Sequence, residues 1–154
     1  MNNFLIKTIW GDFKGEFLDN KLVGLQFPGD FANPPGDFDY LPENLYLVQQ
    51  QISEYIEGKR KNFTFDYLLL NLTKNYEHIL FTLKDRVEYG KTVSYSELAA
   101  LSNIKSPRVA GNCMAKNPLP LIFPCHRVIK KNGDSGQFGP GLFYKEKLLV
   151  LESS

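Results

Sequence analysis

The sequence predicts an α+β protein made of two small units, and three observations support this fold class. Near the start of the chain, short apolar runs of strand length are separated by turn residues. In the second half, apolar residues recur at helical spacing. Between them, the boundary falls near residues 71–75, which are polar except for Leu72 and show no such period. We therefore expect one domain over residues 1–72 and a second over residues 73–154.

The first unit is expected to begin with a β-meander. The predicted strands are residues 4–9, 13–18 and 22–27. Gly11-Asp12 and Asp19-Asn20 provide the turns between them. Residues 28–42 are rich in Pro and Gly and predict a loop, residues 43–57 a helix, and residues 63–70 an extended segment. Nothing in this unit carries recognisable chemistry, so we interpret it as a scaffold.

The second unit is expected to be mainly helical. The first predicted helix has an apolar face from Tyr76 to Val87 and ends at Gly90. The others are a short helix capped by Ser94 and Glu97, one that starts at Ser106-Pro107 and ends at Asn117-Pro118, and residues 142–151. Ser94 and Glu97 have the spacing of a capping box, and Ser106 is the expected N-cap of the next helix. These two helices form a helix-turn-helix candidate. Residues 119–129 are expected to be extended, and Leu142, Leu148 and Leu149 to face inward from the last helix.

Composition limits the class of protein. No apolar run is long enough to span a membrane, which predicts a cytoplasmic protein without a membrane partner. The two cysteines, Cys113 and Cys125, do not form a disulfide framework, and no Cys or His spacing suggests a metal, so we expect no cofactor. Residues 1–77 carry 7 Lys/Arg and 11 Asp/Glu (net −4), whereas residues 78–154 carry 11 and 6 (net +5). The positive net charge of residues 78–154 is compatible with an anionic partner, but a chance distribution of solvated surface charges explains it equally well.

Cys125 and His126 are the candidate reactive residues. A thiol reacts as the thiolate, so Cys125 needs a base, and the adjacent imidazole is a candidate. Neighbours on a regular strand point to opposite faces, so this pair requires a turn at Pro124 or a bridging water. A third group should orient the imidazole, and spacing alone does not choose between Glu97, Glu146 and Glu152. A buried structural Cys and His remain an alternative.

Five motifs in the second unit resemble those of the O6-alkylguanine-DNA alkyltransferase family. They are Y-G-K-T-V-S-Y at residues 89–95, R-V-A-G at 108–111, N-P at 117–118, P-C-H-R-V at 124–128 and K-E-x-L-L-x-x-E at 145–152. The resemblance implies a small N-terminal α/β domain of RNase H type. It also implies a C-terminal, mainly helical domain with a winged-helix-like helix-turn-helix.

The resemblance also implies a reaction, DNA repair by irreversible transfer of an alkyl group from O6-alkylguanine to the protein. O4-alkylthymine is an alternative substrate. Cys125 would be the nucleophile, His126 a base acting through water, and Glu152 the carboxylate that orients it. Tyr95 would help to rotate the nucleotide and donate to the leaving group, and Asn117 would connect the recognition helix to the cysteine loop. Arg127 is expected to be structural.

Double-stranded DNA containing O6-alkylguanine, bound through the minor groove, is the partner that the resemblance implies. Arg108 would enter the base stack in place of the flipped nucleotide. Ser94, Ser96 and Lys131 are expected to contact DNA phosphates. Pro107 and Gly111 are expected to keep the second helix small enough to approach the DNA closely. The expected pocket residues are Met114, Pro120, Val128, Gly136, Phe138 and Gly139, with the loop 135–141 closing over the base. We expect a monomer, and cooperative binding to DNA is left open.

Three departures from the family pattern affect which sizes of alkyl group the site is expected to accept. Val109-Ala110 reverses the usual order, Phe138 replaces the usual Tyr, and Gly139-Pro140 stiffens the loop.

Two functions other than alkyl transfer are considered. A non-catalytic binder of alkylated DNA is disfavoured by the thiol at position 125, and a cysteine hydrolase would not need a helix-turn-helix or Arg108.

Overall fold

The computed structural model describes residues 1–31, 41–133, 136 and 138–154, and it divides into a unit of Met1–Leu70 and a unit of Asn71–Ser154. Most of the predicted loop 28–42, and part of the loop 135–141, lie outside the described residues. The expected α+β class is confirmed, since each unit combines helices with a small sheet. None of the helices in the described ranges is long and apolar enough to cross a membrane.

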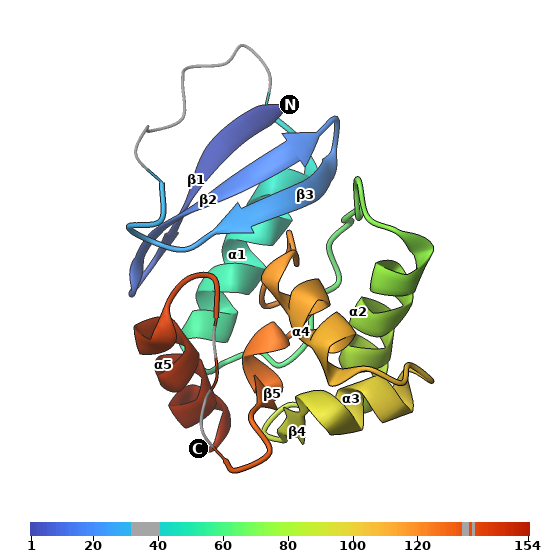
Figure 1. The fold of residues 1–154 in the computed structure, drawn as a ribbon. Helices are drawn as coiled ribbons and strands as arrows, with labels where there is room; N and C mark the ends of the chain where they lie inside the picture. The colour runs from blue at the N-terminus through green and yellow to red at the C-terminus, as the bar shows by residue number, and fades with distance from the viewer. Residues whose placement is uncertain (32–40, 134–135, 137) are drawn as a thin grey trace. The chain divides into compact units, whose positions relative to one another are not determined.

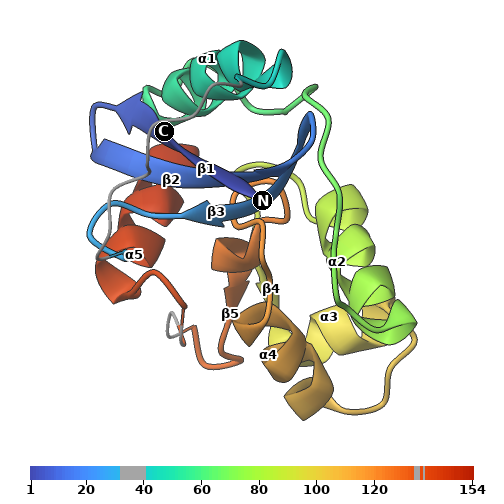
Figure 2. The same cartoon turned by 90° about the horizontal axis from the view of Figure 1, so that it is seen from above.

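The first unit is a three-stranded antiparallel sheet covered by one helix. The strands are β1 (Asn2–Thr8), β2 (Gly11–Leu18) and β3 (Lys21–Gln26), in the order β1-β2-β3, as the meander prediction required. Helix α1 (Asn44–Ile56) lies across one face of this sheet (Figure 2). The apolar side chains between helix and sheet are almost fully buried: Ile6, Phe13, Phe17, Leu22, Ile52 and Tyr55.

Residues 63–70 form less structure than expected. In place of a strand, one isolated bridge joins Tyr67 to Leu22. Leu22 N–H donates to the carbonyl of Asp66, and Leu68 N–H donates to the carbonyl of Leu22.

The second unit brings two helices and the reactive stretch together around a very short sheet (Figure 1). Its elements are α2 (Lys74–Arg86), β4 (Val93–Ser94), α3 (Tyr95–Leu101), α4 (Pro107–Ala115), a 3₁₀ helix (Cys125–Arg127), β5 (Val128–Ile129) and α5 (Leu142–Glu152). Strands β4 and β5 pair in parallel, with Val93 opposite Val128. Because α3 follows β4 directly and the 3₁₀ helix directly precedes β5, this pairing places Tyr95 beside the reactive stretch.

The helix-turn-helix forms from α3 and α4. The predicted capping box is present: the Ser94 hydroxyl accepts from Glu97 N–H at 3.0 Å, and the Glu97 carboxylate accepts from Ser94 N–H. As expected, Pro107 opens α4 and Ser106 is its N-cap residue, although the Ser106 side chain makes no capping hydrogen bond. Helix α4 buries Ala110, Cys113 and Met114.

The prediction of an extended segment over residues 119–129 is wrong except at β5. Three prolines (118, 120 and 124) supply no N–H to a ladder. The Asn117 side chain accepts from Leu119 N–H at 3.0 Å and donates to the Phe123 carbonyl at 2.8 Å, and Phe123 N–H donates back to Leu119. These bonds fold the chain into a buried turn that ends in the 3₁₀ helix.

Helix α5 was predicted, but its buried face differs from the one expected. Leu142 is 53% exposed, Leu149 is half-buried and Leu148 is fully buried. The face that packs inward carries Lys145, Leu148 and Glu152, which are spaced by three and four residues along one side of the helix. This stripe carries two ionisable groups toward the 3₁₀ helix, and the apolar pattern alone did not reveal it.

Candidate active site

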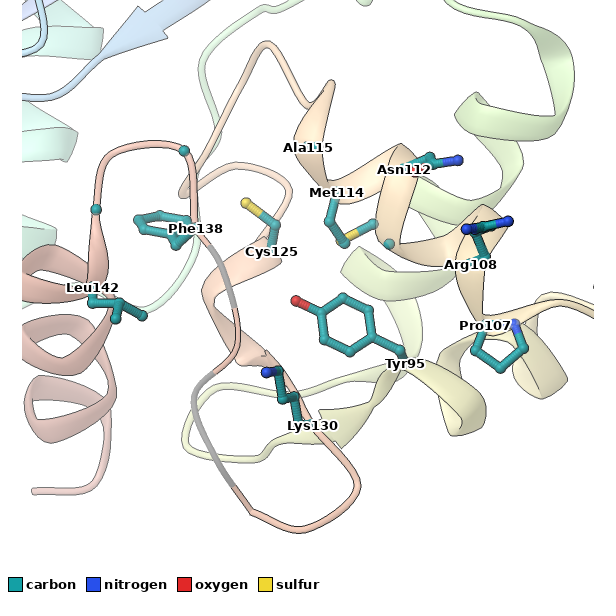
Figure 3. Close-up of a pocket in the computed structure, with 13 residues that line it drawn as sticks. Tyr95, Pro107, Arg108, Asn112, Met114, Ala115, Cys125, Lys130, Phe138 and Leu142 are labelled. Carbon is teal, nitrogen blue, oxygen red and sulfur yellow. The ribbon is translucent and has the colours of Figure 1, made fainter.

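A cavity of about 700 Å³ opens in the second unit, and Cys125 lies on its wall (Figure 3). Its lining comes from α3, α4, the 3₁₀ helix, the loop before α5 and the start of α5. The lining residues are Tyr95, Pro107, Arg108, Gly111, Asn112, Met114, Ala115, Cys125, Lys130, Phe138, Gly139, Gly141 and Leu142. The hydroxyl of Tyr95 points to the side of the cavity where Cys125 lies, whereas Arg108 lies at the far rim. The volume is that of a small-molecule site.

Cys125 is held by the amide of Asn117. Its Sγ accepts a hydrogen bond from Nδ2 of Asn117 at 3.2 Å, and only 6% of the residue is exposed. Burial raises the pKa of the Cys125 thiol to about 11, while the Asn117 hydrogen bond and the charge of Lys145 act in the opposite direction. At neutral pH the group is therefore mainly a thiol, and its reaction requires removal of the proton.

His126 is fully buried next to the thiol and is hydrogen-bonded to Glu152. The distance from Nε2 of His126 to Oε2 of Glu152 is 2.7 Å. Since a carboxylate accepts, Nε2 carries the proton and Nδ1 keeps its lone pair. Nδ1 is buried and has no hydrogen-bond partner among the described residues. Burial, aided by the charges of Arg127 and Lys145, holds the pKa of His126 well below its usual value, so the imidazole is neutral and Nδ1 is unprotonated.

Arg127 completes the group around Glu152. Its Nε donates to Oε1 at 2.8 Å, its Nη2 donates to Oε2 at 3.1 Å, and its Nη1 donates to the Val87 carbonyl. Burial raises the pKa of Glu152 to about 8, whereas the Gly90 N–H favours the ionised form. The two hydrogen bonds from the Arg127 guanidinium favour the carboxylate as well, and because this buried cation lies directly against Glu152 we assign the ionised form to Glu152. Of the three candidate glutamates, Glu97 belongs to the capping box and Glu146 is exposed, so the structure pairs His126 with Glu152.

Two glycines lie next to Tyr95, and of these Gly136 is the one that a close approach of the backbone requires. A Cβ on Gly136 would lie 3.1 Å from the Tyr95 hydroxyl, and φ at Gly136 is +73°, a conformation that favours glycine. A Cβ on Gly111 would lie 3.8 Å from the ring, an ordinary contact. Burial, and then the neighbouring Cys125, raise the pKa of Tyr95, so its hydroxyl stays protonated and able to donate.

The structure gathers most, but not all, of the residues predicted from the sequence. Besides Tyr95 and Cys125, the cavity is lined by Pro107, Arg108, Gly111, Met114, Phe138 and Gly139. Pro120 and Val128 are buried but do not line it, and Gly136 reaches it only through its approach to Tyr95. Ser96 and Lys131 are exposed, whereas Ser94 is buried and its hydroxyl serves the capping box. Among the described residues, no group of three His, Cys, Asp or Glu side chains could hold a metal ion.

Sequence reasoning missed four residues. Asn112, Lys130 and Leu142 line the cavity without any local signal. Lys145 is fully buried, and its Nζ donates to the Val128 carbonyl at 2.6 Å. Two signals were available: Lys145 is the first residue of the K-E-x-L-L-x-x-E motif, and it lies three residues before Leu148 on the buried stripe of α5.

Comparison with known proteins gives one family. Residues 75–154 match the model described as the DNA-binding domain of 6-O-methylguanine DNA methyltransferase. The chain is 29% identical over 147 residues to the methylated-DNA–protein-cysteine methyltransferase of Methanothermobacter thermautotrophicus (96% of this chain, 78% of the relative). It is 33% identical over 145 residues to the corresponding protein of Methanocaldococcus jannaschii, and the match covers 91% of this chain and 84% of that relative. The Mycobacterium tuberculosis OGT structure, in complex with DNA, is similar with a TM-score of 0.83 and 25% identity, covering 99% of this chain and 93% of that one.

Proposed function

The chain belongs to the 6-O-methylguanine DNA methyltransferase family, and from this we propose that it repairs DNA by moving the alkyl group of O6-alkylguanine irreversibly onto its own Cys125. The observation that carries the proposal is the cavity with Cys125 on its wall and the buried His126–Glu152 pair behind it. The family alone would not require a competent site in this chain. Here a nucleophile, a neutral base and a buried carboxylate are all present.

The proton of the thiol is the first to move. It passes through a water molecule to Nδ1 of His126, the nitrogen that keeps its lone pair. Glu152 accepts from Nε2 and stabilises the imidazolium that results. A water relay suits this geometry, because Cys125 and His126 are adjacent in a 3₁₀ helix and each already makes a different hydrogen bond.

Alkyl transfer then takes place by in-line displacement. The sulfur forms a bond to the alkyl carbon, the bond from that carbon to O6 breaks, and its electron pair stays on the guanine. The Tyr95 hydroxyl lies on the Cys125 side of the cavity and donates a proton to the leaving base. The His126 imidazolium then gives its proton to water and the Tyr95 phenolate takes one up, so both side chains return to their starting forms. The product is a thioether, which water does not cleave, so each protein molecule reacts once. No cofactor enters this sequence.

The helix-turn-helix is assigned to DNA, and residues 73–154 to binding and transfer together. Arg108 and Pro107 are exposed on α4 at the cavity rim, and Gly111 keeps α4 low in bulk, which suits the minor groove. A nucleotide turned out of the duplex enters the cavity, and Arg108 takes its place in the stack. Ser96 and Lys131 are exposed and available to phosphates, whereas we assign Ser94 to the stability of α3. The protein acts as a monomer.

The test is an intact-mass measurement with duplex DNA that contains one O6-methylguanine. We expect a gain of one methyl group on Cys125, in proportion to the lesion supplied and without turnover. Cys125→Ser should abolish the gain and still bind the lesion. Cys113→Ser is the matched control and should react, because Cys113 is buried and its pKa is raised to about 12. A folded protein that gains no mass, or that releases the alkyl group repeatedly, would overturn the assignment.

A further inference from the structure

Lys145 is a lysine with no exposed surface, located one turn into α5. Lysine is almost never fully buried without a partner, because moving an ammonium out of water carries a large desolvation cost. The proposed relay does not use Lys145, and it does not line the cavity. A costly buried charge beside a reactive group calls for a role in that group's chemistry.

The side chain of Lys145 connects three elements of the site. Its Nζ donates to the carbonyl of Val128, the residue that follows the 3₁₀ helix of Cys125, at 2.6 Å. The same nitrogen lies 6.0 Å from the ring centroid of Tyr95, at the start of α3. The ammonium of α5 is therefore held between the reactive stretch and the tyrosine that faces the cavity.

Among the described residues, Lys145 is a fully buried cation whose charge acts on the thiol of Cys125. In the part of the chain that the structure describes, the ionisable side chains that interact at this site are Tyr89 before β4, Tyr95 on α3, Cys113 on α4, His126 and Arg127 in the 3₁₀ helix, and Lys145 and Glu152 on α5. The Arg127 charge is neutralised by Glu152 through two hydrogen bonds. Arg108 and Lys130 lie on the cavity wall but are exposed, so that water screens them.

Lys145 and Cys125 favour each other's charged forms. The Lys145 charge opposes the effect of burial on the pKa of Cys125. In return, Cys125 raises the pKa of Lys145, which burial lowers to about 8, so the amine is mainly protonated at neutral pH. The same charge helps to lower the pKa of His126, which keeps the imidazole neutral before the reaction.

We propose that Lys145 is a positioning residue whose buried ammonium favours the ionised, reactive form of Cys125. This inference rests on the function proposed above, in which Cys125 is the nucleophile. Lys145 neither gives up nor gains a proton: the thiol proton still passes to His126, and the ammonium lowers the free energy of the sulfur anion left behind. Through its bond to the Val128 carbonyl, the same group fixes α5 against the reactive stretch.

The test measures the rate of Cys125 alkylation by iodoacetamide as a function of pH, without DNA. In this reaction the sulfur bonds to the methylene carbon and iodide leaves, so its rate follows the thiolate fraction alone. Peptide mass mapping separates Cys125 from Cys113. The variants are Lys145→Met, which removes donor and charge, Lys145→Gln, which keeps a donor without charge, and Lys145→Arg, which keeps the charge. Lys147→Met, at an exposed position on the same helix, is the matched control.

For Lys145→Met and Lys145→Gln we expect rates at neutral pH about tenfold below that of the wild type, with the pH profile displaced upward by about one unit. Lys147→Met should follow the wild-type profile. If Lys145→Gln matched the wild type, the lysine would be a tether only and the proposal would be wrong. If Lys145→Met failed to fold, the comparison of Lys145→Gln with Lys145→Arg would decide. Because the probe needs neither DNA nor a guanine leaving group, its result is independent of whether methyl transfer from DNA is observed.

Discussion

Nε2 of His126 lies 2.7 Å from Oε2 of Glu152, a hydrogen bond between two almost fully buried side chains that are 26 residues apart. The same carboxylate accepts two hydrogen bonds from Arg127. Glu152 therefore orients the imidazole and neutralises the guanidinium at once. This double role means that stability and reactivity are coupled at the end of α5.

Glu152→Gln should impair both properties. The amide can no longer stabilise an imidazolium or neutralise Arg127, which leaves a buried charge without its counter-ion. We expect the single-turnover rate of methyl transfer to fall on the order of 100-fold, and the free energy of unfolding to fall by about 3–5 kcal/mol. Glu146→Gln, at an exposed position on the same helix, is the control. A Glu152→Gln protein with the wild-type rate would contradict the relay.

Acidification should destabilise the fold through His126. Its pKa in the folded protein lies well below 6.5, so on acidification the unfolded chain takes up this proton first. Proton uptake by the unfolded state lowers stability, and the loss should begin as pH falls through about 6.5 and grow by about 1.4 kcal/mol per unit of pH. Chemical denaturation of wild type and His126→Gln at pH 7 and pH 5 checks this. The difference in unfolding free energy between the two proteins reports the contribution of His126. From pH 7 to pH 5 the wild type should lose more stability than His126→Gln.

Two neighbouring serines should separate folding from DNA binding. The Ser94 hydroxyl accepts from Glu97 N–H in the capping box, so Ser94→Ala should lower the free energy of unfolding by about 1 kcal/mol. Ser96 is exposed, and Ser96→Ala should leave stability unchanged but weaken binding to duplex DNA at low salt. Thermal denaturation and DNA titration of both variants distinguish these roles. An unaltered stability in Ser94→Ala would show that the cap is dispensable.

Local signals in the sequence predicted much of this fold. The meander, α1, α2 and α5 follow from short-range periodicity, and the capping box at Ser94 marks the start of α3. The segment after Asn117 was mispredicted, because its conformation depends on side-chain bonds from Asn117 to the backbone of Leu119 and Phe123. Apolar composition in this segment indicates burial but not backbone conformation. The resemblance drawn from five motifs is confirmed by the family comparison.

The candidate site was less accessible to sequence reasoning. A single sequence does not say which of three glutamates meets His126, because that depends on how α5 packs against the 3₁₀ helix. The burial of Lys145 was missed for a related reason: a charged residue is normally expected at the surface, and the K-E-x-L-L-x-x-E motif names the residue without saying that it is buried. The resemblance supplied Glu152, and the structure pairs it with His126. Glu152 and Lys145 lie on one helix face, where functional groups occupy positions that periodicity assigns to apolar side chains.

Gly111→Ala provides a test of where α4 meets DNA. Alanine in a helix interior is more favourable than glycine by about 0.5–1 kcal/mol. The new methyl group would meet the Tyr95 ring at 3.8 Å, an ordinary contact, so the fold should become more stable by about that amount. The methyl group also adds bulk to the helix proposed to enter the minor groove, so affinity for duplex DNA should fall severalfold. Chemical denaturation and titration with lesion-free duplex measure the two effects. The iodoacetamide rate of Cys125 should stay at its wild-type value, since the thiol is not displaced. A stabilised variant with undiminished DNA affinity would place the contact surface elsewhere than on this face of α4.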